Sequence, residues 1–82
     1  MSHIAEKYVE SLMSQVAKED QENPGRKTII YSSTITDPDE VKAGEEITAL
    51  FEKRLREYFQ GADISVRGYG GSGYNIQAQV KR

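Results

Sequence analysis

Residues 62–82 carry the alternating pattern of a β-hairpin whose register is already fixed. Apolar and polar side chains alternate on both sides of Gly71-Ser72-Gly73, which is typical of strands with one buried and one solvated face. A glycine at position 73 suits the positive φ that a three-residue hairpin loop requires. This loop determines which residues lie opposite each other: Ile64 and Val80, Val66 and Ala78, Arg67 and Gln77, and Asp63 and Lys81.

Three further elements are predicted upstream of the hairpin. Apolar residues at helical spacing predict a helix from about His3 to Lys18, with Ser2 as its N-cap. The polar segment 18–27 contains Pro24-Gly25 and is predicted to be a surface loop. The β-branched segment 28–35 predicts a strand, with the side chains of Ile29, Tyr31, Ser33 and Ile35 facing inward.

The second helix has the clearest start signal in the chain. Asp37 is the predicted N-cap and Pro38 takes the first helical position, while Gly61 is predicted to end the helix. Gly44 lies near the predicted buried face, which indicates close packing against a neighbouring backbone or a break in the first turn. The buried stripe of this helix is predicted to contain Ile47, Leu50, Phe51, Leu55, Tyr58 and Phe59.

The resulting order is α-β-α-β-β. We expect an α+β fold, a two-layer sandwich in which two helices cover one face of a three-stranded sheet. Residues 1–82 are too few for more than a single small domain, and the core is thin enough that sharing it with a partner chain is plausible.

Composition excludes several classes of protein. The chain has no cysteine, which excludes disulfides and thiolate metal sites. No apolar run is long enough to span a membrane, and Met1-Ser2-His3 does not begin a signal peptide. We therefore expect a soluble, cytoplasmic protein with no membrane partner.

No constellation of catalytic or metal-binding residues is present. His3 is the single histidine, and it has no cysteine or second histidine to complete a metal site or a nucleophilic triad. Asp37, Asp39 and Glu40 form an acidic cluster that helix capping explains, and its spacing lacks the calcium-loop pattern. We expect no metal, no cofactor and no enzymatic activity.

The outer face of the predicted sheet is polar but nearly uncharged. Short, neutral side chains on a sheet suit a surface that another protein covers. The predicted partner-binding residues are Ser32, Thr34, Arg67, Tyr69, Gln77 and Gln79. The free edges of the sheet and the small core also predict self-association.

The glycine- and tyrosine-rich hairpin tip carries an alternative function. Its loop joins two strands and no Lys-Ser or Lys-Thr follows, so it is not a P-loop. A nucleic-acid or nucleotide site at the tip would use Arg67, Tyr69, Tyr74, Lys81 and Arg82. The net charge of −2 opposes this alternative, because neutralising phosphates drives such binding.

The element order resembles the Alba-like nucleic-acid-binding fold. That family begins with a further strand and carries a basic surface, and this chain has neither, so we assign no family. Size, acidity and the absence of cysteine are similar to those of phage accessory proteins. The sequence predicts a non-enzymatic protein-binding module, a small regulator or inhibitor, that forms homo-oligomers.

Overall fold

The computed structural model describes residues 3–82, and the C-terminal hairpin forms in the predicted register. Strands β2 (Asp63–Gly71) and β3 (Gly73–Lys81) are antiparallel and pair Ile64 with Val80 and Arg67 with Gln77. Gly73 has a φ of +86°, as the loop requires. A Cβ at Gly73 would also lie 2.3 Å from the Ile35 carbonyl oxygen, so this glycine is needed for close approach as well as for its dihedral.

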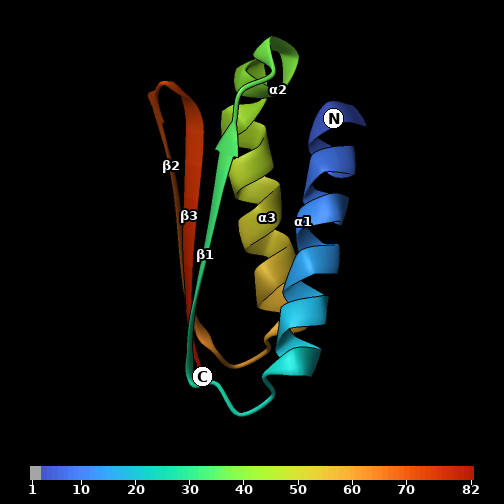
Figure 1. The fold of residues 1–82 in the computed structure, drawn as a ribbon, viewed down its shortest axis with the longest axis vertical. Coiled ribbons are helices and arrows are strands. Elements are labelled where there is room, and N and C mark those ends of the chain that lie inside the picture. Colours follow the sequence, from blue (N-terminus) through green and yellow to red (C-terminus); the bar gives the residue numbers. More distant parts are fainter. Residues whose placement is uncertain (1–2) are drawn as a thin grey trace.

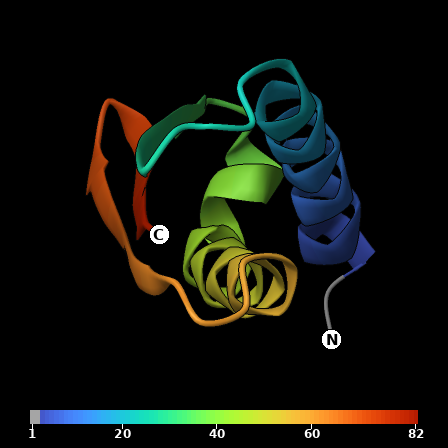
Figure 2. The ribbon, with the colours of Figure 1, turned by 90° about the horizontal axis from the view of Figure 1, so that it is seen from below.

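Strand β1 (Thr28–Ile35) pairs with the other side of β3, which gives the sheet order β1-β3-β2. Both neighbours are antiparallel to β3, and β1 and β2 therefore run parallel to each other without touching. The remaining elements are α1 (His3–Glu22), α2 (Pro38–Lys42) and α3 (Gly44–Tyr58). All three helices lie on one side of the sheet, which curves around α3 (Figures 1 and 2). The α+β fold and its α-β-α-β-β order are confirmed.

The core forms between the helices and the inner face of the sheet. Its buried residues come from every strand and from both long helices. The alternation predicted for β1 is confirmed, because Ile29 and Ile35 are buried and Ile30 and Ser32 are exposed. Ser33, the polar residue of the inward row, meets α1 through a hydrogen bond of 2.5 Å between its hydroxyl and that of Tyr8.

Helix α1 is four residues longer than the sequence predicts, so the loop covers 23–27 and not 18–27. Its last turn is polar, but tertiary contacts hold it: the Asp20 carboxylate accepts hydrogen bonds from Tyr58 and Arg82. The helix ends at Glu22, and the backbone N–H of the next residue, Asn23, donates to the Glu19 carbonyl at 3.0 Å. The N-cap predicted at Ser2 lies outside the described residues.

The second predicted helix is two helices with a break at Ala43 (φ −92°, ψ 9°). Asp37 caps α2 as predicted, since its Oδ1 accepts the backbone N–H groups of Asp39 and Glu40. Gly44 follows the break and packs closely, since a Cβ there would lie 2.6 Å from the ring of Tyr74. The predicted break and the predicted close packing therefore occur together, although Gly44 packs against a side chain and not against a backbone.

Tyr58 is the one member of the predicted stripe that the structure leaves exposed, at 43%. Helix α3 ends at Tyr58, and the chain turns at Phe59 towards Gly61, which has a φ of +84°. Because the helical spacing stops there, Phe59 points into the core and Tyr58 points out. Leu50 is half-buried, and Ile47, Phe51 and Leu55 are buried as predicted.

Phe51→Ala tests the assignment of this helix face. Phe51 is 2% exposed, and truncating a buried aromatic costs about 3–5 kcal/mol through lost burial and a cavity. Urea denaturation is expected to show a loss of that order. Tyr69→Ala is the matched control, because Tyr69 is 54% exposed and its truncation should cost about 1 kcal/mol or less. Equal losses for the two variants would contradict the fold.

Gly44→Ala tests the contact with Tyr74. Alanine is the better helix former, by up to about 1 kcal/mol, but the added methyl group overlaps the ring, and overpacking costs about 1–3 kcal/mol. We expect a net destabilisation that Tyr74→Leu largely relieves in the double variant, measured by thermal unfolding. Gly25→Ala, where nothing lies within 4 Å, should be close to neutral. A stabilising Gly44→Ala would show that the ring is not held there.

Candidate protein-binding face

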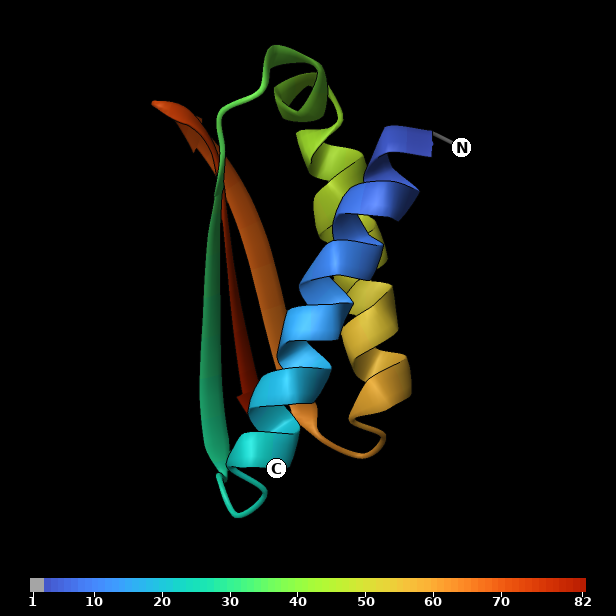
Figure 3. The ribbon, with the colours of Figure 1, turned by 45° about the vertical axis from the view of Figure 1, so that its right-hand side comes forward.

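The face of the sheet turned away from the helices is built from four rows, each crossing β2, β3 and β1 in turn. The register places the odd-numbered residues of β2 and β3 beside the even-numbered residues of β1 on this outer face. The rows are Asp63–Lys81–Thr28, Ser65–Gln79–Ile30, Arg67–Gln77–Ser32 and Tyr69–Asn75–Thr34. No helix covers this face in the part of the chain that the structure describes, as Figure 3 shows.

The outer face is neutral apart from three side chains. Asp63 and Lys81 lie opposite each other at one end, and Arg67 is the single charged residue in the other three rows. Ile30 is 61% exposed and Tyr69 is 54% exposed, so two large side chains stand on a surface otherwise made of hydroxyls and amides. Such a surface is weakly hydrated compared with one rich in lysine and glutamate, and it costs less to cover.

All six residues predicted to bind a partner lie on this outer face. Three of them form the complete row Arg67–Gln77–Ser32. Thr34 lies in the Tyr69 row, where its hydroxyl donates to the Asn75 side-chain oxygen at 3.1 Å. The sixth residue, Gln79, lies between Ser65 and Ile30.

Beyond the predicted set, three residues complete the three rows that follow the Asp63–Lys81–Thr28 end: Ile30, Ser65 and Asn75. Ile30, Ser65 and Gln79 line a shallow depression of about 160 Å³, together with Arg67, Gln77 and Ala78. Alternation along the sequence already places these three residues outside. The part of Ile30 in the depression follows only from the pairing of β1 with β3, which no local pattern encodes.

The residues of the alternative nucleic-acid site do not share a surface. Arg67 and Tyr69 are on the outer face, whereas Tyr74 points inward between Gly44 and Gly68. Lys81 lies at the opposite end of β3 from the hairpin tip. The guanidinium of Arg82 forms an ion pair with Asp20 and lies 5.1 Å from the centre of the Phe59 ring.

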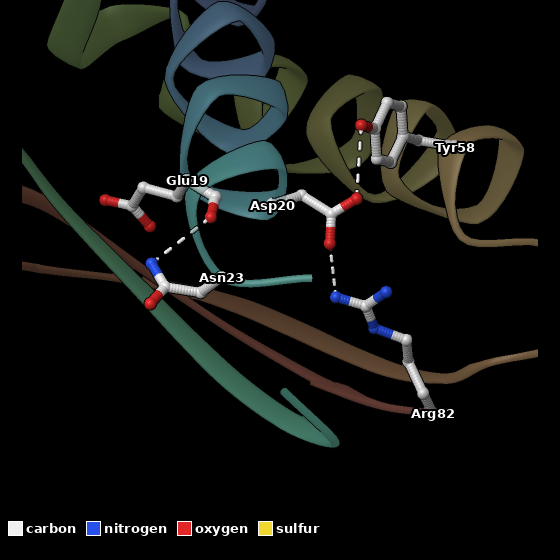
Figure 4. A network of polar contacts seen from close by, with 5 residues as sticks. All are labelled: Glu19, Asp20, Asn23, Tyr58 and Arg82. Atoms are coloured by element: carbon white, nitrogen blue, oxygen red, sulfur yellow. Dashed lines mark hydrogen bonds and ion pairs between the residues drawn. The ribbon is translucent and has the colours of Figure 1, made fainter. Parts of the chain in front are cut away.

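The ion pair of Arg82 belongs to a polar network that ties the end of α1 to the sheet (Figure 4). The Asp20 carboxylate accepts from the Tyr58 hydroxyl at 3.3 Å and from the Arg82 guanidinium. The backbone N–H of Arg82 donates to the Lys27 carbonyl at 2.8 Å, which continues the β1–β3 ladder. This network explains Arg82 as a structural residue.

Tyr31 is the buried polar group nearest this network. Its hydroxyl is buried and has no hydrogen-bond partner among the described residues. Burial raises the pKa of Tyr31 to about 12, and the carboxylates of Glu19 and Asp20 add to the increase.

Metal and membrane sites find no support in residues 3–82. Within that range no group of three or more histidine, cysteine, aspartate or glutamate side chains could hold a metal ion. One carboxylate oxygen of Asp37 accepts the two backbone N–H groups that it caps at the start of α2. No helix in the same range is both long and apolar enough to cross a bilayer.

Comparisons of this chain with protein-family models, curated proteins and solved structures give no match.

Tyr31→Phe tests the environment of the buried hydroxyl. The pKa of Tyr31 is about 12 in the folded chain and near 10 in the unfolded chain, so its ionisation does not lower the free energy of unfolding below pH 10. Between pH 10 and pH 12 the free energy of unfolding falls, because this tyrosine ionises first in the unfolded chain. We expect Tyr31→Phe to match or exceed the wild type in stability at pH 7 and to lose less of it towards pH 12, measured by urea denaturation. Parallel pH profiles for the two proteins would contradict the raised pKa.

Proposed function

We propose that this chain is a non-enzymatic protein-binding module that docks through the outer face of its sheet and associates with a second copy of itself. The observation that carries the proposal is the uncovered, nearly neutral face on which Ile30 and Tyr69 are exposed. A small cytoplasmic regulator or inhibitor, such as the accessory proteins of phages, fits this behaviour.

The composition of the face suits contact with an identical face. Its serine, threonine, asparagine and glutamine side chains both donate and accept hydrogen bonds, so either copy satisfies the other. Arg67 is the only charged residue in the three rows beyond Asp63–Lys81–Thr28. The one like-charge pair that a dimer must keep apart is therefore Arg67 of each copy. Two sheets pack face to face at about 10 Å, with side chains of this size interdigitating.

The size of the face predicts weak association. Three strands about 4.8 Å apart and eight residues of about 3.3 Å each give a footprint of roughly 400 Å² per copy. Stable complexes bury about 800 Å² per partner, so contact through this face alone belongs with transient complexes. A dimer of this strength can exchange one copy for another protein, as a regulator must.

A pair of substitutions, Thr34→Glu with Gln77→Glu, tests the face. Both side chains are exposed and point away from the core, so the fold should remain intact. The carboxylate at position 77 lies opposite Arg67, but the one at position 34 has no cation opposite it, and burying an unpaired carboxylate costs several kcal/mol. We expect the variant to stay at the monomer mass of 9.2 kDa while the wild type exceeds it at high concentration. Analytical ultracentrifugation over a concentration series measures this difference.

The matched control carries the same added charge elsewhere: Ser14→Glu with Gln60→Glu, two exposed positions off the face. This control should associate like the wild type. A wild type that stays monomeric at all concentrations would refute self-association. Salt-dependent binding of oligonucleotides that is lost in Tyr69→Ser would instead favour the nucleic-acid alternative.

A further inference from the structure

The two edges of the sheet are not equivalent, and the hydrogen-bond pattern shows which groups of β1 face outward. Arg82 and Lys27 form a hydrogen-bonded pair one step beyond Thr28 and Lys81 in the β1–β3 register. Antiparallel ladders alternate, so the odd-numbered residues 29–35 bond to β3. The even-numbered residues therefore direct their N–H and C=O groups to the outer edge: Thr28, Ile30, Ser32 and Thr34.

The other edge, on β2, is protected. Arg56 donates from its Nη2 to the Ile64 carbonyl oxygen at 3.2 Å, which occupies one outward acceptor. The strand also contains Asp63, Arg67 and several glycines, features that discourage strand pairing. The eight residues of β1 include no charge, no proline and no glycine, and their register with β3 runs without a bulge.

A crevice of about 110 Å³ lies along the unprotected edge, between β1 and α1. Four consecutive residues, Ile30–Ser33, form one wall. Ile30 and Ser32 direct their backbone groups to this edge, whereas Tyr31 and Ser33 turn their half-buried side chains inward. Leu12, Gln15, Val16 and Glu19 of α1 form the opposite wall, and Phe51 and Ile76 also line the crevice. Figure 3 shows the C-terminal end of α1 approaching the start of β1.

The charge around the crevice is negative. Within residues 3–82 the Glu19 carboxylate has no ion pair, and it points away from Asp20 in Figure 4. The last turn of α1 adds the negative end of the helix dipole. Burial is the main cause of the raised pKa of Tyr31, and the carboxylates of Glu19 and Asp20 add to it while Arg82 opposes it.

We propose that this crevice binds an extended segment of a partner protein, which adds to β1 as a fourth strand. The outward N–H and C=O groups of Ile30 and Ser32 hold its backbone. One apolar side chain of the segment enters the cavity, and a neighbouring lysine or arginine meets Glu19. The site uses the backbone groups of Ile30 and Ser32, whose side chains lie on the outer face, but the proposal does not depend on docking through that face. The β1 strand of a second copy fits this site less well. It has no basic residue to meet Glu19, and its Ile29 and Ile35 side chains are buried in its own core.

The probe is a series of eight-residue peptides of alternating threonine and valine, in which one leucine and one lysine are moved along the chain. Nitrogen-15 NMR titrations should show shifts at Ile30–Ser33 and on the facing side of α1. Methylating two alternate backbone amides of the best peptide removes two hydrogen bonds and should weaken binding about tenfold or more. Replacing its lysine by glutamate should weaken binding about fivefold, and Glu19→Lys should reverse that preference.

Ser32→Pro removes an outward N–H without removing a bond to β3, and should abolish peptide binding. Ser32→Ala keeps the N–H and should bind within about twofold of the wild type. Should Ser32→Pro fail to fold, the methylated peptides make the same test on the unaltered protein. The proposal is overturned if no peptide binds at millimolar concentration, if the shifts spare the α1 residues that line the crevice, or if methylated peptides bind equally well. If the wild type binds no peptide and Ser32→Pro loses self-association, the edge binds a second copy and not a partner protein.

Discussion

The structure depends on one strand, β3, which exchanges backbone hydrogen bonds with neighbours on both sides. Its even-numbered residues bond to β1 and its odd-numbered residues to β2, since ladder bonds alternate along an antiparallel strand. Central placement buries Ile76, Ala78 and Val80 almost completely on the inner side. The same placement leaves β1 and β2 as edges, so the surfaces available to partners follow from it.

The helices are fixed to the sheet at both ends by contacts that tolerate little change. At one end the Tyr74 ring lies between Gly44 of α3 and Gly68 of β2, where a Cβ would come within 2.6 Å of it on either side. At the other end Arg82 joins Asp20, Phe59 and the Lys27 carbonyl. Phe51 and Leu55 fill the space between these two ends. The helices therefore cover the inner face and leave the outer face bare.

The bare face and the β1 edge offer two different kinds of recognition. The face presents side chains, and its neutrality lowers the cost of removing it from water. The edge presents backbone groups, which bind any extended chain, and the adjoining crevice selects among such chains by size and charge. Edge strands usually carry charges or proline that prevent pairing, and β1 carries neither. An uncharged edge strand without proline can pair with other chains and cause aggregation unless a partner or a neighbouring element covers it.

The sequence alone determined the hairpin register, the limits of β1 and the cap of α2, because alternation, a glycine with positive φ and an Asp-Pro start act over a few residues. It also placed all six predicted partner residues on one face. Long-range contacts decided the rest. Asp20 is polar and follows the predicted end of α1, yet it stays helical because Arg82, far along the chain, pairs with it. Tyr74 belongs to the core because Gly44 makes room for it, and Tyr58 is exposed because the helix ends there. The crevice exists only where α1 lies beside β1, a relation between segments that local patterns cannot specify since it depends on how the whole core packs.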